Sequence, residues 1–141
     1  MEDRRLKLLI VDDEVDIRES LSRILERYGY SVLTAQDGEE GLNIINEHDI
    51  DIVLCDIGMP KMDGIEFLKN IRKFTLKAEV IIITGQSTID RCVDAIEQNT
   101  SGYLLKPLKT EDILDNIRRA EKRVEEKKKM LELAFSDKQK K

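Results

Sequence analysis

Five side chains that could do chemistry follow short apolar runs of this sequence: Asp12, Asp13, Asp56, Thr84 and Lys106. The runs that precede them cover residues 8–11, 50–55, 80–83 and 103–105. Strands of a parallel sheet are buried on both faces, so they read as largely apolar runs, and ligands bind just outside their carboxyl ends. The sequence therefore predicts that these five side chains meet at one edge of a sheet.

Together these side chains suit a divalent cation and a phosphoryl group. Carboxylates are the hard oxygen ligands that Mg²⁺ prefers, so Asp12, Asp13 and Asp56 can hold one. Asp56 can also attack phosphorus, with the cation reducing the repulsion between the two anions. Lys106 can neutralise the phosphoryl oxygens, and Thr84 can donate a hydrogen bond to one of them. Each residue alone would be read as a helix start or a surface residue, so only their convergence predicts a site.

Strand-like and helix-like patterns alternate along the chain. We expect strands over 8–11, 30–35, 50–56, 79–84 and 102–106. Apolar residues at three- and four-residue intervals predict the helices, over 17–28, 37–47, from Asp63 to about 71, over 87–98, and from Thr110 or Glu111 onward. Five such units with short connections predict a doubly wound α/β fold, in which five helices cover a five-stranded parallel sheet. The strand order 2-1-3-4-5 is favoured because it places strand one beside strand three and so gathers the three aspartates.

Length and composition limit the classes of protein. The 141 residues suit one domain, which we place at 1–120, and a tail at 121–141. The net charge of −5 gives no general attraction to nucleic acid or to anionic lipid, so we expect neither direct nucleic-acid binding nor membrane binding. The N-terminus lacks a signal-peptide pattern, and Cys55 and Cys92 read as reduced, buried thiols. We therefore expect a cytoplasmic protein.

The last helix is expected to continue past the domain. Apolar residues recur there in alternating four- and three-residue steps, interrupted only by Lys127: Ile113, Ile117, Ala120, Val124, Leu131 and Ala134. Residues 121–141 contain eight basic and five acidic side chains, so they carry +3 and the preceding residues carry −8. Lysines near a helix C-terminus suit its dipole, so we interpret this segment as a charged helical extension or coiled-coil linker. Its apolar seam predicts a contact between two chains.

Between about Arg5 and Ala120 the chain resembles the receiver domain of two-component response regulators. The motifs that carry the resemblance are Val11-Asp12-Asp13-Glu14, Asp56 followed by Met59-Pro60 and Asp63-Gly64, Thr84-Gly85, and Lys106-Pro107. The resemblance implies the flavodoxin-like variant of the doubly wound fold. It also implies that the partner is a sensor histidine kinase or a phosphotransfer protein.

The resemblance assigns a role to each polar strand end. Asp56 would accept a phosphoryl group from a phosphohistidine of the partner. Asp12 and Asp13 would hold Mg²⁺, together with the Asp56 carboxylate and the backbone carbonyl of Gly58. Lys106 would contact the phosphoryl oxygens that the cation does not reach.

The resemblance also implies a switch. Thr84 would be drawn toward the phosphoryl group, and Tyr103 would change rotamer to fill the space that Thr84 leaves. The bond before Pro107 is a candidate for a cis peptide, since only Xaa-Pro bonds tolerate that geometry at modest cost. The face made by the helix over 87–98, the strand over 102–106 and the last helix would change shape. A homodimer would form through this face or through the C-terminal helix.

Two other interpretations stay open. A magnesium-dependent phosphohydrolase also uses an aspartyl nucleophile, but a haloacid-dehalogenase-like enzyme would be expected to carry a second acid two residues later, where this chain has Gly58. We therefore expect no enzyme activity beyond self-phosphorylation from small donors and slow autodephosphorylation. The second interpretation is a receiver fragment of a longer effector or hybrid kinase. The residues do not identify the cognate kinase, the stimulus or the output.

Overall fold

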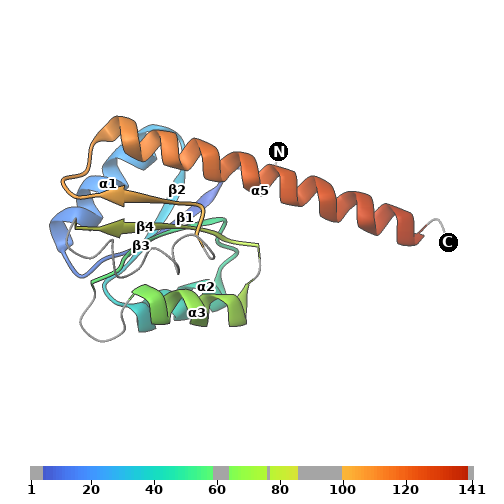
Figure 1. Ribbon diagram of the computed structural model, residues 1–141, viewed down its shortest axis with the longest axis horizontal. Helices are drawn as coiled ribbons and strands as arrows, with labels where there is room; N and C mark the ends of the chain where they lie inside the picture. Colours follow the sequence, from blue (N-terminus) through green and yellow to red (C-terminus); the bar gives the residue numbers. More distant parts are fainter. Residues whose placement is uncertain (1–4, 59–63, 76, 86–99, 140–141) are drawn as a thin grey trace.

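Five parallel strands form a single sheet in the computed structural model, which describes residues 5–58, 64–75, 77–85 and 100–139 (Figure 1). The strands pair in the order β2-β1-β3-β4-β5, which confirms the predicted order. The strand bounds are β1 Lys7–Val11, β2 Ser31–Ala35, β3 Ile52–Asp56, β4 Glu79–Thr84 and β5 Gly102–Leu105. They agree with the predicted strands to within two residues at either end.

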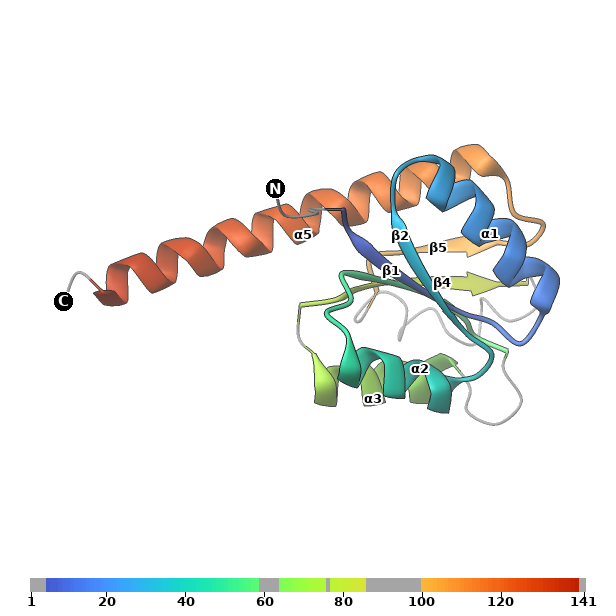
Figure 2. The ribbon, with the colours of Figure 1, turned by 180° about the vertical axis from the view of Figure 1, so that it is seen from behind.

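Helices cover both faces of the sheet. Their bounds are α1 Val15–Arg27, α2 Gly38–Glu47, α3 Gly64–Phe74 and α5 Thr110–Gln139. The two ribbon views show α1 and α5 on one face and α2 with α3 on the other (Figures 1 and 2). The described part of the chain contains four helices where we predicted five. The helix expected over 87–98 lies outside the described residues, and so do Asp63 and Cys92.

Alternating strand residues divide the core into two halves. Successive side chains of a strand point to opposite faces. On β1, Leu9 and Val11 therefore pack toward α2 and α3, whereas Leu8 and Ile10 pack toward α1 and α5. Because both faces are covered, β3 and β4 are buried at every position. This burial is why these strands read as continuous apolar runs in the sequence.

Short local signals in the sequence determine where α1 ends and where α2 begins. Gly29 has a φ of 94°, a conformation that glycine adopts without steric penalty, and it ends α1. The Asp37 side chain accepts a hydrogen bond from the Glu40 backbone N–H at 2.9 Å, which caps the start of α2. These signals explain why both helix boundaries were predicted within about two residues.

Helix α5 belongs partly to the domain and partly to a protruding segment. Its inner face is buried at Ile113, Ile117, Ala120 and Val124. The helix then runs straight out of the α/β layers, as both ribbon views show (Figures 1 and 2). The boundary expected between 1–120 and 121–141 therefore falls inside a continuous helix. None of the described helices is long and apolar enough to cross a membrane.

Candidate functional site

The site lies where the winding of the sheet reverses. Strand β1 has β2 on one side and β3 on the other, and Val11 pairs with Cys55 in the register of β1 and β3. The residues that follow these two positions, Asp12 and Asp56, therefore emerge side by side at the carboxyl edge of the sheet. In an open α/β sheet this reversal point is where a crevice forms and ligands bind.

Three carboxylates converge at this edge. One oxygen from each of Asp12, Asp13 and Asp56 lies within 4.8 Å of the other two. Asp12 and Asp56 are buried, whereas Asp13 is exposed. Like charges at this spacing repel one another, and a divalent cation with oxygen ligands would relieve the repulsion.

Asp12 is the most constrained of the three. Its Oδ1 accepts a hydrogen bond from the Glu14 backbone N–H at 2.8 Å, while its buried Oδ2 has no hydrogen-bond partner among the described residues. Burial raises the pKa of Asp12 to about 6; the Glu14 hydrogen bond opposes this rise, and the neighbouring charge of Asp56 adds to it. A buried carboxylate oxygen that accepts no hydrogen bond is suited to bind a hard cation.

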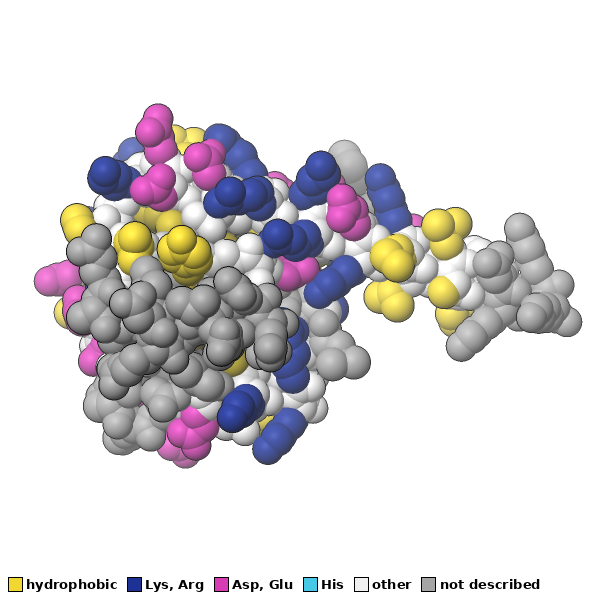
Figure 3. Space-filling view, viewed as in Figure 1, with side chains coloured by type: hydrophobic (Ala, Val, Ile, Leu, Met, Phe, Trp, Pro, Cys, Tyr) yellow, Lys and Arg dark blue, Asp and Glu magenta, His cyan; other side chains and the backbone are white. Residues whose placement is uncertain are grey.

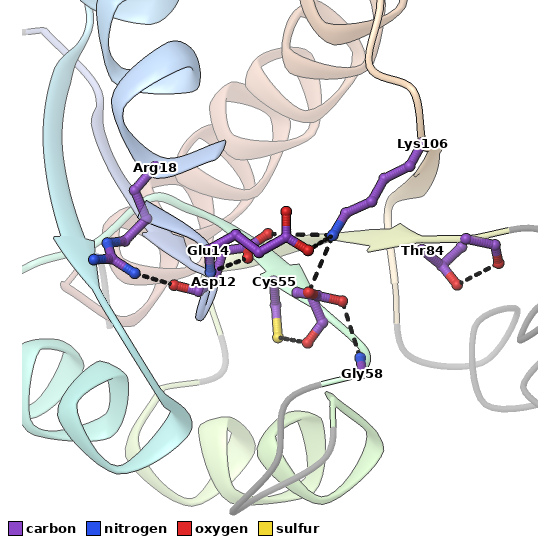
Figure 4. Close-up of polar contacts among 9 residues, drawn as sticks. Asp12, Glu14, Arg18, Cys55, Gly58, Thr84 and Lys106 are labelled. Carbon is purple, nitrogen blue, oxygen red and sulfur yellow. Dashed lines mark hydrogen bonds and ion pairs between the residues drawn. The ribbon is translucent and has the colours of Figure 1, made fainter. Parts of the chain in front are cut away.

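Lys106 supplies the positive charge of the site. Its Nζ lies 3.3 Å from Asp56 Oδ2, 3.5 Å from Glu14 Oε1 and 3.8 Å from Asp12 Oδ2 (Figure 4). Burial by itself would lower the pKa of Lys106, but the carboxylates of Asp12 and Asp56 outweigh it, so the pKa is raised. The amine therefore stays charged at neutral pH. The peptide bond between Lys106 and Pro107 is cis.

Asp56 is held at both carboxylate oxygens. Its Oδ1 accepts a hydrogen bond from the Gly58 backbone N–H at 2.9 Å, and its Oδ2 faces Lys106. A Cβ at position 58 would lie 3.7 Å from Asp56 Oδ1, so any side chain there would stand against the carboxylate. Glycine at this position thus leaves one approach to Asp56 uncovered. The Gly58 carbonyl as a cation ligand stays a prediction.

Thr84 and Tyr103 come from the two strands on the other side of β3. Thr84 is buried, and its hydroxyl donates to the Gly85 carbonyl oxygen at 3.0 Å (Figure 4). Tyr103 pairs with Ile82 and is about half exposed. In this conformation Thr84 bonds its own neighbour, and Tyr103 stands on the surface. The structure thus groups Asp12, Asp13, Asp56 and Lys106, with Thr84 at the next strand end.

The sequence interpretation missed two contacts of the site. The Arg18 guanidinium donates to the backbone carbonyl of Asp12 at 2.6 Å, and the Glu14 carboxylate reaches Lys106. Positions 14 and 18 are four residues apart at the start of α1, directly after the acidic pair. Helical spacing puts such residues on one face. That spacing was the signal that could have identified them.

Comparison with known proteins gives consistent matches. The family model described as "Response regulator receiver domain" matches residues 8–118. The transcriptional regulatory protein ZraR of Klebsiella oxytoca is 39% identical over 108 residues, which are 77% of this chain and 24% of that protein. The response regulator MprA of Mycobacterium sp. (strain KMS) is 34% identical over 113 residues, 80% of this chain and 49% of that protein. This chain therefore spans between a quarter and a half of these curated relatives.

A solved structure extends the similarity to the fold. The crystal structure of a response regulator receiver domain protein from Clostridium thermocellum is 35% identical in sequence and superposes with a TM-score of 0.78. The match covers 89% of this chain and 98% of that one. The similarity therefore extends over most of this chain and nearly all of that one.

Proposed function

Because the chain belongs to the response regulator receiver domains of two-component systems, we propose that it is a phosphoacceptor whose Asp56 takes a phosphoryl group from a sensor histidine kinase or a phosphotransfer protein. One observation above all supports this proposal. Three carboxylates converge within 4.8 Å, and the amine of Lys106 lies 3.3 Å from one of them, Asp56.

Magnesium is part of the proposal, and the residues fit it. Asp12, Asp13 and Asp56 offer carboxylate oxygens, and the backbone carbonyl of Gly58 would be a fourth ligand. The buried Asp12 Oδ2, which lacks a hydrogen-bond partner among the described residues, supports the assignment. When bound, the cation supplies charge that lets a carboxylate and a phosphoryl group approach each other.

The transfer step requires little chemistry from the protein besides positioning. An oxygen of Asp56 forms a bond to phosphorus while the phosphorus–nitrogen bond of the donor phosphohistidine breaks. The bonding electrons leave with the imidazole nitrogen, which takes up a proton from solvent. Lys106 then balances charge on the transferred oxygens, because its ammonium already lies against Asp56.

The response would be a shift between conformers that the protein already samples. A phosphoryl group brings about two negative charges and three strong acceptors. The Thr84 hydroxyl would leave the Gly85 carbonyl for one of these acceptors, and Tyr103 would turn inward from its half-exposed position. The surface that includes β5 and α5 would change as a result. A homodimer formed through that surface, or through the end of α5, is the output we propose.

Other assignments are less well supported. A receiver domain is typically a signalling domain and not an enzyme, and the uncovered Gly58 position offers no second acid for a phosphohydrolase. Since the chain spans a quarter to a half of its curated relatives, an attached output module is part of the proposal. ZraR is called a transcriptional regulatory protein, so a DNA-binding output is one candidate.

The test is labelling with acetyl phosphate and Mg²⁺, followed by intact-mass measurement. The parent protein should gain one phosphoryl group, which EDTA should prevent, and Asp56→Asn should gain none. Asp16→Asn is the matched control, because Asp16 is an exposed acid in the first turn of α1. If Asp56→Asn were labelled as well as the parent, the acceptor would be another residue. Rapid turnover of small phosphomonoesters would instead favour the phosphohydrolase.

A further inference from the structure

The amine of Lys106 is shared among three carboxylates, and one of them has no role in the proposed phosphotransfer. Asp56 is the proposed phosphoacceptor, and Asp12 is a proposed ligand of the cation. The third, Glu14, reaches the same amine at 3.5 Å, only slightly farther than Asp56 at 3.3 Å (Figure 4). The Glu14 side chain is 58% exposed, whereas the Lys106 side chain is 24% exposed. Glu14 therefore contacts the cationic group from the solvent side of the site.

This arrangement places the Glu14 charge near the group that is to be phosphorylated. Because both oxygens lie so close to one amine, Glu14 Oε1 and Asp56 Oδ2 are at most about 7 Å apart. A phosphoryl group on Asp56 would bring about two negative charges into the same space. It would then compete with Glu14 for the ammonium group of Lys106, and the two anions would repel each other.

We infer that Glu14 is a positioning residue that holds Lys106 back from the phosphoryl group and so weakens the phosphorylated state. The inference rests on the proposed function. In the resting protein Glu14 draws the ammonium toward solvent. On phosphorylation Lys106 must give up its contact with Glu14 to bond the phosphoryl oxygens. The loss of this contact offsets part of the attraction between Lys106 and the phosphoryl group. Glu14 thus lowers the stability of the phosphorylated state relative to the unphosphorylated state.

The local structure indicates that Glu14 is not needed for folding. It is the N-cap residue of α1, but its side chain makes no capping hydrogen bond. Its backbone N–H bonds Asp12, and its backbone carbonyl accepts from the Arg18 backbone N–H, so a substitution would keep both contacts. Another charged group nearby, the Arg18 guanidinium, donates to the Asp12 carbonyl. Glutamine at position 14 should therefore remove the charge and leave the backbone unchanged.

The experiment compares beryllofluoride binding by the parent and by Glu14→Gln. Beryllofluoride stands in for the phosphoryl group, and its dissociation constant would be measured by calorimetry at saturating Mg²⁺. Exposed ion pairs are weak, so we expect Glu14→Gln to bind about two- to fivefold tighter than the parent. Raising the salt concentration should reduce the difference between the two dissociation constants, because salt screens an exposed charge. A packing effect would not depend on salt in this way.

Two further variants separate charge from shape. Glu14→Asp keeps the charge and should stay close to the parent, and Asp16→Asn removes one exposed charge from the same helix turn and should bind like the parent. Magnesium affinity is titrated separately for each variant. If Glu14 were a cation ligand instead, Glu14→Gln would bind Mg²⁺ more weakly and beryllofluoride no tighter, which would overturn the inference.

The proposed function and the proposed role of Glu14 can be disproved separately. If the parent does not bind beryllofluoride, the proposed function is wrong, and the role of Glu14 is wrong with it. If the parent binds and Glu14→Gln binds equally or less tightly at saturating Mg²⁺, only the role of Glu14 is wrong.

Discussion

The buried carboxylate of Asp12 reduces the stability of the folded chain. The residue is fully buried, and one of its carboxylate oxygens has no hydrogen-bond partner among the described residues. Keeping that carboxylate ionised therefore costs free energy, and the raised pKa of about 6 reflects the cost. Natural proteins accept such local penalties where a ligand is to bind.

The raised pKa of Asp12 predicts how stability depends on pH in the metal-free protein. The folded protein holds this proton up to about pH 6, whereas an unfolded aspartate releases it near 3.8. Between these values the folded state binds more protons than the unfolded state, so the free energy of unfolding falls as the pH rises. This loss of stability is complete above about pH 6, and it amounts to about 3 kcal/mol at most.

Asp12→Asn should therefore stabilise the protein at pH 7.5 by about 1–3 kcal/mol and have little effect at pH 4. Urea unfolding in EDTA at the two pH values would measure the difference. Asp16→Asn should change stability little at either pH, because Asp16 is exposed. An Asp12→Asn variant less stable than the parent at pH 7.5 would contradict this account of the buried charge.

At the scale of elements, one ion pair explains why a lysine interrupts the apolar seam of α5. Lys127 Nζ lies 3.2 Å from Glu79 Oε1, and the Glu79 side chain is 8% exposed. Glu79 begins β4 and also bonds the hydroxyl of Ser101, next to the start of β5. Lys127 thus links α5 to the beginnings of β4 and β5, at the edge of the sheet opposite Asp12 and Asp56.

Removing this lysine should leave a buried carboxylate without its cation. We expect Lys127→Met to lower the free energy of unfolding by about 1–2 kcal/mol, less than for a fully buried pair because Lys127 is partly exposed. Urea unfolding would measure the loss, with Lys122→Met as the control at an exposed position of the same helix. In a double-mutant cycle with Glu79→Gln, additive effects would show that the two side chains are not coupled.

In the whole molecule, the protruding end of α5 has apolar side chains that the rest of the domain does not cover. Its large apolar side chains are 62–70% exposed, and they gather on the part of the helix that extends beyond the layers, as Figure 3 shows. These side chains are Met130, Leu131, Leu133 and Phe135. Contiguous exposed apolar residues usually mark a surface of association. The seam predicted from the sequence continues here through Leu131 and Ala134.

We expect this end of α5 to pair with that of a second chain. Light scattering after gel filtration should show a dimer for the parent at micromolar concentration, and a monomer for the double variant Leu131→Lys with Phe135→Lys. Phe74→Lys is the control, since Phe74 is an equally large apolar residue exposed elsewhere. A parent protein that is monomeric with and without beryllofluoride would contradict a dimeric output through this helix.

Most of the fold, and the set of side chains that meet at the site, could be predicted from the sequence. Runs such as 50–56 and 79–84 read as buried strands, because a parallel sheet is covered on both faces and its strands are apolar throughout. Once five of them alternate with helices, handedness and short connections leave few windings, and the polar residues at their ends must meet. Asp12, Asp56 and Lys106 were predicted on one edge for this reason. Local periodicity predicted the helices and strands, and the polar residues at the strand ends favoured this strand order.

The contacts among these groups could be seen only in the folded structure. The ion pairs of Lys106 with Glu14 and Asp56, and of Lys127 with Glu79, join residues that lie 48 to 92 positions apart in the sequence. The pKa of Asp12 likewise depends on burial by elements that follow it in the chain. Periodicity describes which face of one element is apolar; it does not describe which partner that face meets. Contacts of that kind exist only after the elements have packed.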